Sequence, residues 1–79
     1  MTKLPIISSR QLIRALRAAG FEYAPKRGKG SHIAMVKKDN EKTRLVIVPE
    51  RRTLPRGTLH AILDQAGLGK TEFLKLLKE

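Results

Sequence analysis

The sequence predicts an α+β fold in which helices lie on one face of a three-stranded antiparallel sheet. Two observations lead to this prediction. Three stretches of the chain carry apolar residues at helical spacing. Between the first and the second of these stretches lie short apolar runs that are separated by turn residues. Residues 1–79 are expected to form a single domain without a linker or repeat. The expected elements are a helix over about 9–19, strands over about 21–26, 32–37 and 43–48, and helices over about 56–66 and 70–78.

The first helix carries signals for both of its ends. Ser8 and Gln11 have the Ser-x-x-Gln spacing of a capping box, in which each residue satisfies a backbone donor of the other. Apolar residues then recur at helical spacing as far as Ala19. Gly20 stands where a left-handed residue typically ends a helix.

A basic stripe runs along the same helix. Arg10, Arg14 and Arg17 fall at i, i+4 and i+7 and therefore share one side, away from the apolar face. A solvated helix face is the commoner explanation of such a stripe. Because no acidic residue interrupts it, binding to phosphates is here an equally good explanation.

The sheet is predicted from short apolar runs. Residues 33–36 and 45–48 are apolar, and the polar residues 38–41 between them indicate a hairpin. Residues 21–24 alternate in polarity and precede Pro25, which is typical of an edge strand.

The last two helices follow the third strand. Pro55 suits a helix start, and apolar residues recur at helical spacing from Leu59 to Ala66. Gly67 is a stop signal, after which residues 70–78 predict a short final helix.

Charge gives the first indication of function. The chain has a net charge of +10, and all of this excess lies in residues 1–60, with fourteen Lys and Arg against four Asp and Glu. Nucleic acid, an acidic protein or an anionic membrane would each suit this charge. There is no cysteine, so neither a disulfide nor a zinc–thiolate site is available. No apolar run is long enough for a membrane span or a signal peptide, and we expect a cytoplasmic protein.

The run Gly28-Lys29-Gly30-Ser31-His32 is the strongest candidate site. It places one imidazole behind a cationic glycine segment, and histidine both donates and accepts protons near neutral pH. RNA carries its own nucleophile, the 2′-hydroxyl, so its cleavage needs proton transfer and stabilisation of charge. The pattern therefore indicates RNA cleavage, with His32 as the candidate catalytic residue. The expected RNA-binding residues are Lys26, Arg27, Lys29, Gly30, Ser31 and Lys37, with Arg10, Arg14 and Arg17.

Each of these residues also has a structural interpretation. His32 could be a strand histidine that bonds a neighbour, and the two glycines could serve only a turn or a bulge. Ser31 either bonds a phosphate or makes a local turn. His60 is interpreted as a surface histidine of the second helix. No metal site is expected, because acidic residues are scarce.

The order of these motifs resembles the HicA toxins, the YcfA-like family of bacterial toxin–antitoxin pairs. The resemblance spans nearly the whole chain and depends on the order and spacing of several strings. They are LRAAGF over 16–21, GSH over 30–32, VIVP over 46–49, LPRGTL over 54–59, IL over 62–63, QAGL over 65–68 and EF over 72–73.

This resemblance implies a fold similar to a double-stranded-RNA-binding domain and an mRNA interferase activity with no known metal cofactor. The family's catalytic histidine matches His32, and a HicB antitoxin would cover it. The implied partners are therefore messenger RNA and a HicB-like protein, without any cofactor. In two places the sequence departs from the family pattern: Glu50 follows Pro49 where many relatives have a second histidine, and Met35 occupies a position that is often aromatic.

Two other functions remain possible from the sequence. A non-catalytic module that grips double-stranded RNA by its shape would explain the charge equally well, but it would not require His32. A DNA-binding regulator is less favoured, because residues 56–66 offer few side chains that read bases.

Overall fold

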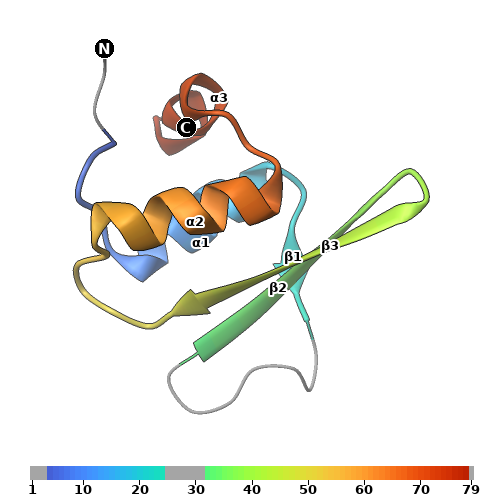
Figure 1. Ribbon diagram of the computed structural model, residues 1–79, viewed down its shortest axis with the longest axis horizontal. Coiled ribbons are helices and arrows are strands. Elements are labelled where there is room, and N and C mark those ends of the chain that lie inside the picture. The colour runs from blue at the N-terminus through green and yellow to red at the C-terminus, as the bar shows by residue number, and fades with distance from the viewer. Residues whose placement is uncertain (1–3, 25–31, 79) are drawn as a thin grey trace.

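Six elements follow one another in the computed structural model, which describes residues 4–24 and 32–78 (Figure 1). They are α1 (Ser9–Ala18), β1 (Glu22–Tyr23), β2 (His32–Asp39), β3 (Lys42–Pro49), α2 (Arg56–Ala66) and α3 (Lys70–Leu77). The strands form one antiparallel sheet in the order β1-β2-β3. Helices α1 and α2 lie on one side of this sheet, and α3 packs on α1 (Figure 1). The predicted α+β fold and its element order are confirmed.

Helix α1 has the caps that its sequence predicted. The Ser8 hydroxyl accepts a hydrogen bond from the Gln11 backbone N–H at 3.2 Å, and Gln11 Oε1 accepts one from the Ser8 backbone N–H at 2.9 Å. The helix ends at Ala18, one residue earlier than expected. Gly20 follows with φ +103°, a backbone conformation that glycine adopts without a steric penalty.

The hairpin between β2 and β3 is tighter than the sequence predicted. We expected a turn over residues 38–41, but both strands continue until only two residues, Asn40 and Glu41, connect them. Asn40 has φ +57°. Asparagine tolerates this left-handed conformation, so a two-residue turn can close the hairpin. The ladder therefore runs without a break from the pair Asp39–Lys42 to the pair His32–Pro49.

Strand β1 is shorter than its predicted range of 21–26. Phe21 is buried in the core, and only Glu22 and Tyr23 belong to the strand. The Ala24 backbone N–H still donates to the Ala34 carbonyl at 2.9 Å. Residues 25 and 26 lie outside the described part of the chain.

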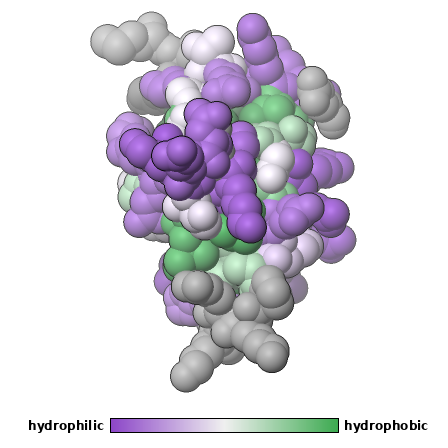
Figure 2. Space-filling view, turned by 90° about the vertical axis from the view of Figure 1, so that its right-hand side faces the viewer, coloured by the Kyte–Doolittle hydropathy of each residue, from purple (hydrophilic) through white to green (hydrophobic). Residues whose placement is uncertain are grey.

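The core lies between the sheet and the helices. Its fully buried large side chains are Leu12, Leu16, Phe21, Met35, Val46, Val48, Leu54, Leu59 and Phe73. On the opposite face of the sheet, Leu45 and Ile47 remain 40% and 39% exposed. An apolar surface is visible below the hydrophilic tip of the hairpin in Figure 2. Among the described residues, no helix has the length and apolarity that crossing a membrane requires.

Candidate nucleic-acid interface

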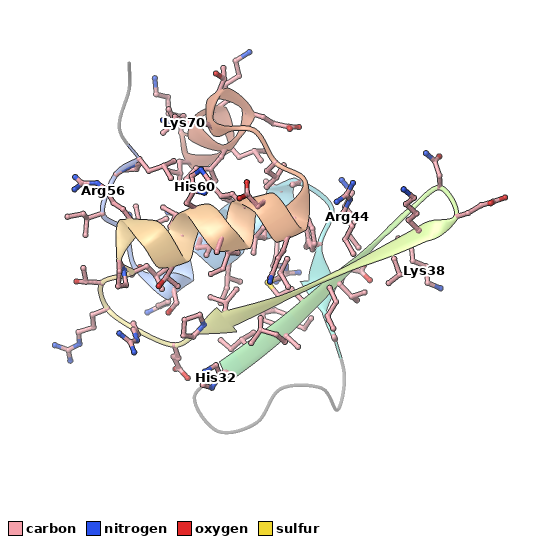
Figure 3. All side chains as sticks on the ribbon, viewed as in Figure 1. His32, Lys38, Arg44, Arg56, His60 and Lys70 are labelled. Atoms are coloured by element: carbon pink, nitrogen blue, oxygen red, sulfur yellow. The ribbon has the colours of Figure 1, made fainter. Side chains whose placement is uncertain are left out.

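His32 is the first residue of β2, at the end of the hairpin opposite the turn (Figure 3). Its neighbour Ile33 packs against the core on the helix side of the sheet. Because successive side chains of a strand alternate between faces, His32 is directed to the face that the helices leave open. The residue is exposed. Its imidazole is therefore accessible to a molecule that approaches this end of the sheet.

The cationic glycine segment before His32 lies outside the described residues. Five of the predicted RNA-binding residues fall in it, namely Lys26, Arg27, Lys29, Gly30 and Ser31. Their roles stay predictions from the sequence.

A groove of about 930 Å³ lies between α1 and the strands, and we call it the α1 groove. Among residues 4–24 and 32–78, the polar side chains that line it are Arg10, Gln11, Arg14, Arg17 and Glu50. The same part of the chain also contributes Ile13, Tyr23 and Ile33 to its lining. The three arginines predicted to share one side of the helix thus do so, and all three are exposed in this groove. They span about 10 Å of the helix axis, since each residue adds 1.5 Å.

Tyr23 brings an aromatic ring to the arginines. Its pairing with Met35 places it on the helix side of the sheet, next to α1. The guanidinium carbon of Arg17 lies 5.4 Å from the centroid of the ring, which is within cation–π range. Tyr23 is nevertheless 52% exposed, so aromatic surface remains available in the α1 groove.

The segment after β3 is fastened to the first turn of α1 by Ser9, which is only 3% exposed. The Ser9 backbone N–H and hydroxyl donate to the Arg51 carbonyl at 2.9 Å and 3.0 Å. The Arg51 backbone N–H donates in turn to the Ser9 hydroxyl at 3.1 Å. These bonds hold the preceding residue, Glu50, in the α1 groove. Glu50, which follows Pro49 directly, thus brings an acidic side chain into the groove.

Lys37 is separated from His32 by the structure. The two lie five residues apart on β2, which corresponds to about 16 Å along the strand. The Lys37 ammonium lies 5.8 Å from the centroid of the Phe21 ring. Lys37 is also on the helix side of the sheet, as Ile33 and Met35 of the same strand are. A role of Lys37 in RNA binding stays a prediction, at a site distinct from His32.

Several residues were not predicted from the sequence to line a groove. Gln11 comes from α1, Ile33 from β2 and Glu50 from the segment after β3, and only the packing of α1 against the sheet brings them together. Ser9 was not recognised either, because its partner Arg51 is 42 residues away. The alternation of β2 was the one available signal, since it places Ile33 on the same face as Met35.

The second histidine lies away from this site. His60 is on α2, on the helix side of the molecule, whereas His32 is at the end of the sheet (Figure 3). Its Nδ1 lies 3.3 Å from Asp64 Oδ2, and both side chains are largely exposed, as expected for a surface histidine. Across residues 4–24 and 32–78, His, Cys, Asp and Glu side chains nowhere gather in the groups of three that a metal ion needs.

The fold and the site thus define a small basic α+β domain with an exposed histidine at one end of its sheet and an arginine-lined groove beside its first helix. A comparison with protein families gives a match over residues 9–68 to the HicA toxin of bacterial toxin–antitoxin systems. This range contains α1, all three strands and α2. The chain belongs to the HicA toxin family. No curated protein matches the sequence.

Proposed function

We propose that this member of a toxin family is an endoribonuclease that cleaves messenger RNA without a metal ion, with His32 as the general acid and base. The observation that carries the proposal is the exposed imidazole at the start of β2 in a chain of the HicA family. The arginines of the α1 groove supply positive charge for the RNA backbone. Messenger RNA as the substrate implies a cytoplasmic site of action.

The proposed reaction uses a nucleophile that belongs to the RNA. His32 takes the proton of the 2′-hydroxyl, and the 2′-oxygen attacks the neighbouring phosphorus. The bond from phosphorus to the 5′-oxygen breaks, and this oxygen takes up the proton that His32 holds, so His32 acts first as base and then as acid. The products are a 2′,3′-cyclic phosphate and a 5′-hydroxyl, and His32 is neutral again. A positioned base of this kind typically contributes about 10²–10⁴-fold to the rate.

Positive charge has two tasks in this proposal. Lys26, Arg27 or Lys29, with the Gly30 backbone and the Ser31 hydroxyl, hold the scissile phosphate beside His32. Arg10, Arg14 and Arg17 hold the RNA backbone further away, in the α1 groove. Cations that face developing charge on phosphate oxygens stabilise the transition state, whereas more distant ones add binding affinity.

The partner proposed for this toxin is an antitoxin of the HicB type, which inhibits it by covering His32. The net charge of +10 favours an acidic surface on this partner, because opposite charges accelerate association. A complex that retained full ribonuclease activity with His32 open to solvent would contradict this mode of inhibition.

The test compares wild type, His32→Ala and His60→Ala on end-labelled RNA in the presence of a chelator. His60 is a matched control, since it is the other of the two histidines and lies exposed on α2. We expect wild type and His60→Ala to release products with cyclic phosphate ends, and His32→Ala to be slower by about 10²–10⁴-fold. If His32→Ala cleaves as fast as wild type, the catalytic assignment is wrong. If none of the three cleaves but all bind RNA, the chain is a binding module.

A further inference from the structure

The α1 groove is not a uniformly basic surface. Its arginines share it with Ile13, Ile33 and Tyr23, of which Ile13 is buried and Ile33 half-buried. Phosphates alone would not require these apolar and aromatic surfaces, and a nucleobase would make use of them. This combination of side chains bears on whether the groove binds RNA as a single strand or as a duplex.

We propose that the α1 groove binds a single-stranded segment of RNA, with one base stacked on Tyr23 and the adjoining phosphates bound by Arg10 and Arg14. The proposal rests on the proposed function in taking RNA as the substrate. It makes Tyr23 the residue that selects single-stranded over double-stranded RNA.

The geometry around Tyr23 favours stacking. Arg17 lies over the ring with its guanidinium carbon 5.4 Å from the centroid, a cation–π contact that favours this position of the ring in the groove. The residue keeps 52% of its surface exposed, so a base can stack on the accessible part of the ring. Base–aromatic stacking typically changes affinity by about 5- to 150-fold when the ring is removed.

The lining of the groove favours a single strand. The groove is open to solvent, and its volume of about 930 Å³ is large enough for a small ligand such as a nucleotide. An A-form duplex keeps its bases stacked inside and offers mainly phosphates and its shallow groove to a protein. The apolar part of the α1 groove would find no partner on such a duplex. An unpaired base, by contrast, can unstack from its neighbours and enter the α1 groove.

The groove also lies close to the proposed catalytic residue along the sheet. Tyr23 pairs with Met35, which is three residues from His32, or about 10 Å along β2. Ile33, in the lining of the groove, is the direct neighbour of His32. A strand that stacks on Tyr23 therefore reaches His32 within a short length of RNA.

The protein contains one tyrosine and no tryptophan, so its intrinsic emission reports on Tyr23 alone. The probe is a 2′-O-methyl RNA strand, which has no free 2′-hydroxyl and resists cleavage, used single-stranded or as a hairpin duplex of the same composition. We expect the single strand to quench the tyrosine emission of wild type in a saturable manner, and the duplex to leave it unchanged.

The affinities of variants are measured by anisotropy of the labelled probes. Tyr23→Ala should weaken binding of the single strand by about 5- to 150-fold and change binding of the duplex by less than twofold, whereas Tyr23→Phe should keep both affinities. Far-ultraviolet circular dichroism of each variant establishes that it is folded. Equal losses for both probes, an unchanged affinity of Tyr23→Ala for the single strand, or no quenching would each overturn the proposal.

The outcome is independent of the nuclease assay. Quenching by the single strand without any cleavage by wild type would remove the proposed ribonuclease function and leave the binding site in place. Cleavage that depends on His32, without quenching, would support the ribonuclease function and overturn the binding site at Tyr23.

Discussion

Two glycines at opposite ends of α2, ten residues apart, should respond to alanine substitution with opposite changes in protein stability. Gly57 lies in the first turn of the helix, and a Cβ added to it meets nothing within 4 Å. Gly67 ends the helix with φ +72°, and a Cβ there would lie 2.7 Å from the Arg44 guanidinium carbon. Gly57→Ala should therefore stabilise the protein, and Gly67→Ala should destabilise it.

The magnitudes follow from these two environments. Alanine at Gly57 removes the entropic disadvantage of glycine in a helix and raises the free energy of unfolding by about 0.5–1 kcal/mol. Alanine at Gly67 must adopt the left-handed conformation, which costs about 1–2 kcal/mol. It must also displace the flexible end of the Arg44 side chain, which adds a smaller cost. The two variants should differ by about 2 kcal/mol or more, and for a domain of this size that corresponds to about 8–16 °C in melting temperature.

The assay is urea denaturation followed by circular dichroism, with thermal melts of the same samples. Arg44→Ala provides a background that separates the two costs at Gly67, because only the backbone strain remains once the guanidinium is gone. Gly67→Ala should then be less damaging in the Arg44→Ala protein than in wild type. The reasoning is refuted if both alanine variants shift stability in the same direction, or if Gly67→Ala is as stable as wild type.

Two further predictions concern the groove. Arg14→Ala should reduce the slope of log K against log salt concentration for single-stranded RNA by about 0.7, the value for one phosphate contact. Lys42→Ala removes an equal charge beside the hairpin turn and should leave this slope unchanged. Equal effects of the two substitutions on RNA binding would contradict a role for the groove. Ser9→Ala should lower the free energy of unfolding by about 1–3 kcal/mol, because it leaves the part-buried Arg51 N–H without its partner. Ser8→Ala, at the neighbouring position, loses only the helix cap and should lower the free energy of unfolding by about 1 kcal/mol.

Local signals in the sequence were enough to predict most of the fold. The capping box at Ser8 and the glycines at 20 and 67 act on their own backbone, so they mark the ends of α1 and α2 without tertiary context. The hairpin was predicted too short because four polar residues were all taken as a turn. The turn needs only Asn40, with its left-handed backbone, and Glu41, because residues 38 and 39 belong to β2.

The site was less predictable, because it depends on how elements meet. The arginine stripe follows from helical spacing within one element and was found from the sequence. Tyr23 and Glu50 join it only through the pairing of Tyr23 with Met35 and the bonds from Ser9 to Arg51. Neither contact is encoded in a short stretch of sequence, and a shift of one residue in register would move Tyr23 to the other face.

The positions of His32 and the α1 groove constrain how one RNA molecule uses both. Ile33 lines the groove on the helix side of the sheet, and the alternation of β2 directs His32 to the other side. A substrate that engages both must pass over the end of the hairpin, beside the pair of His32 and Pro49, and cannot lie flat on one face of the sheet. A single strand can bend over this end, whereas a duplex stacked along its length resists such a bend. In the proposed reaction, the groove contacts would be the same in the bound state and in the transition state, and the contact with His32 would change as the proton moves. Loss of a groove arginine should therefore raise KM, and loss of His32 should lower kcat.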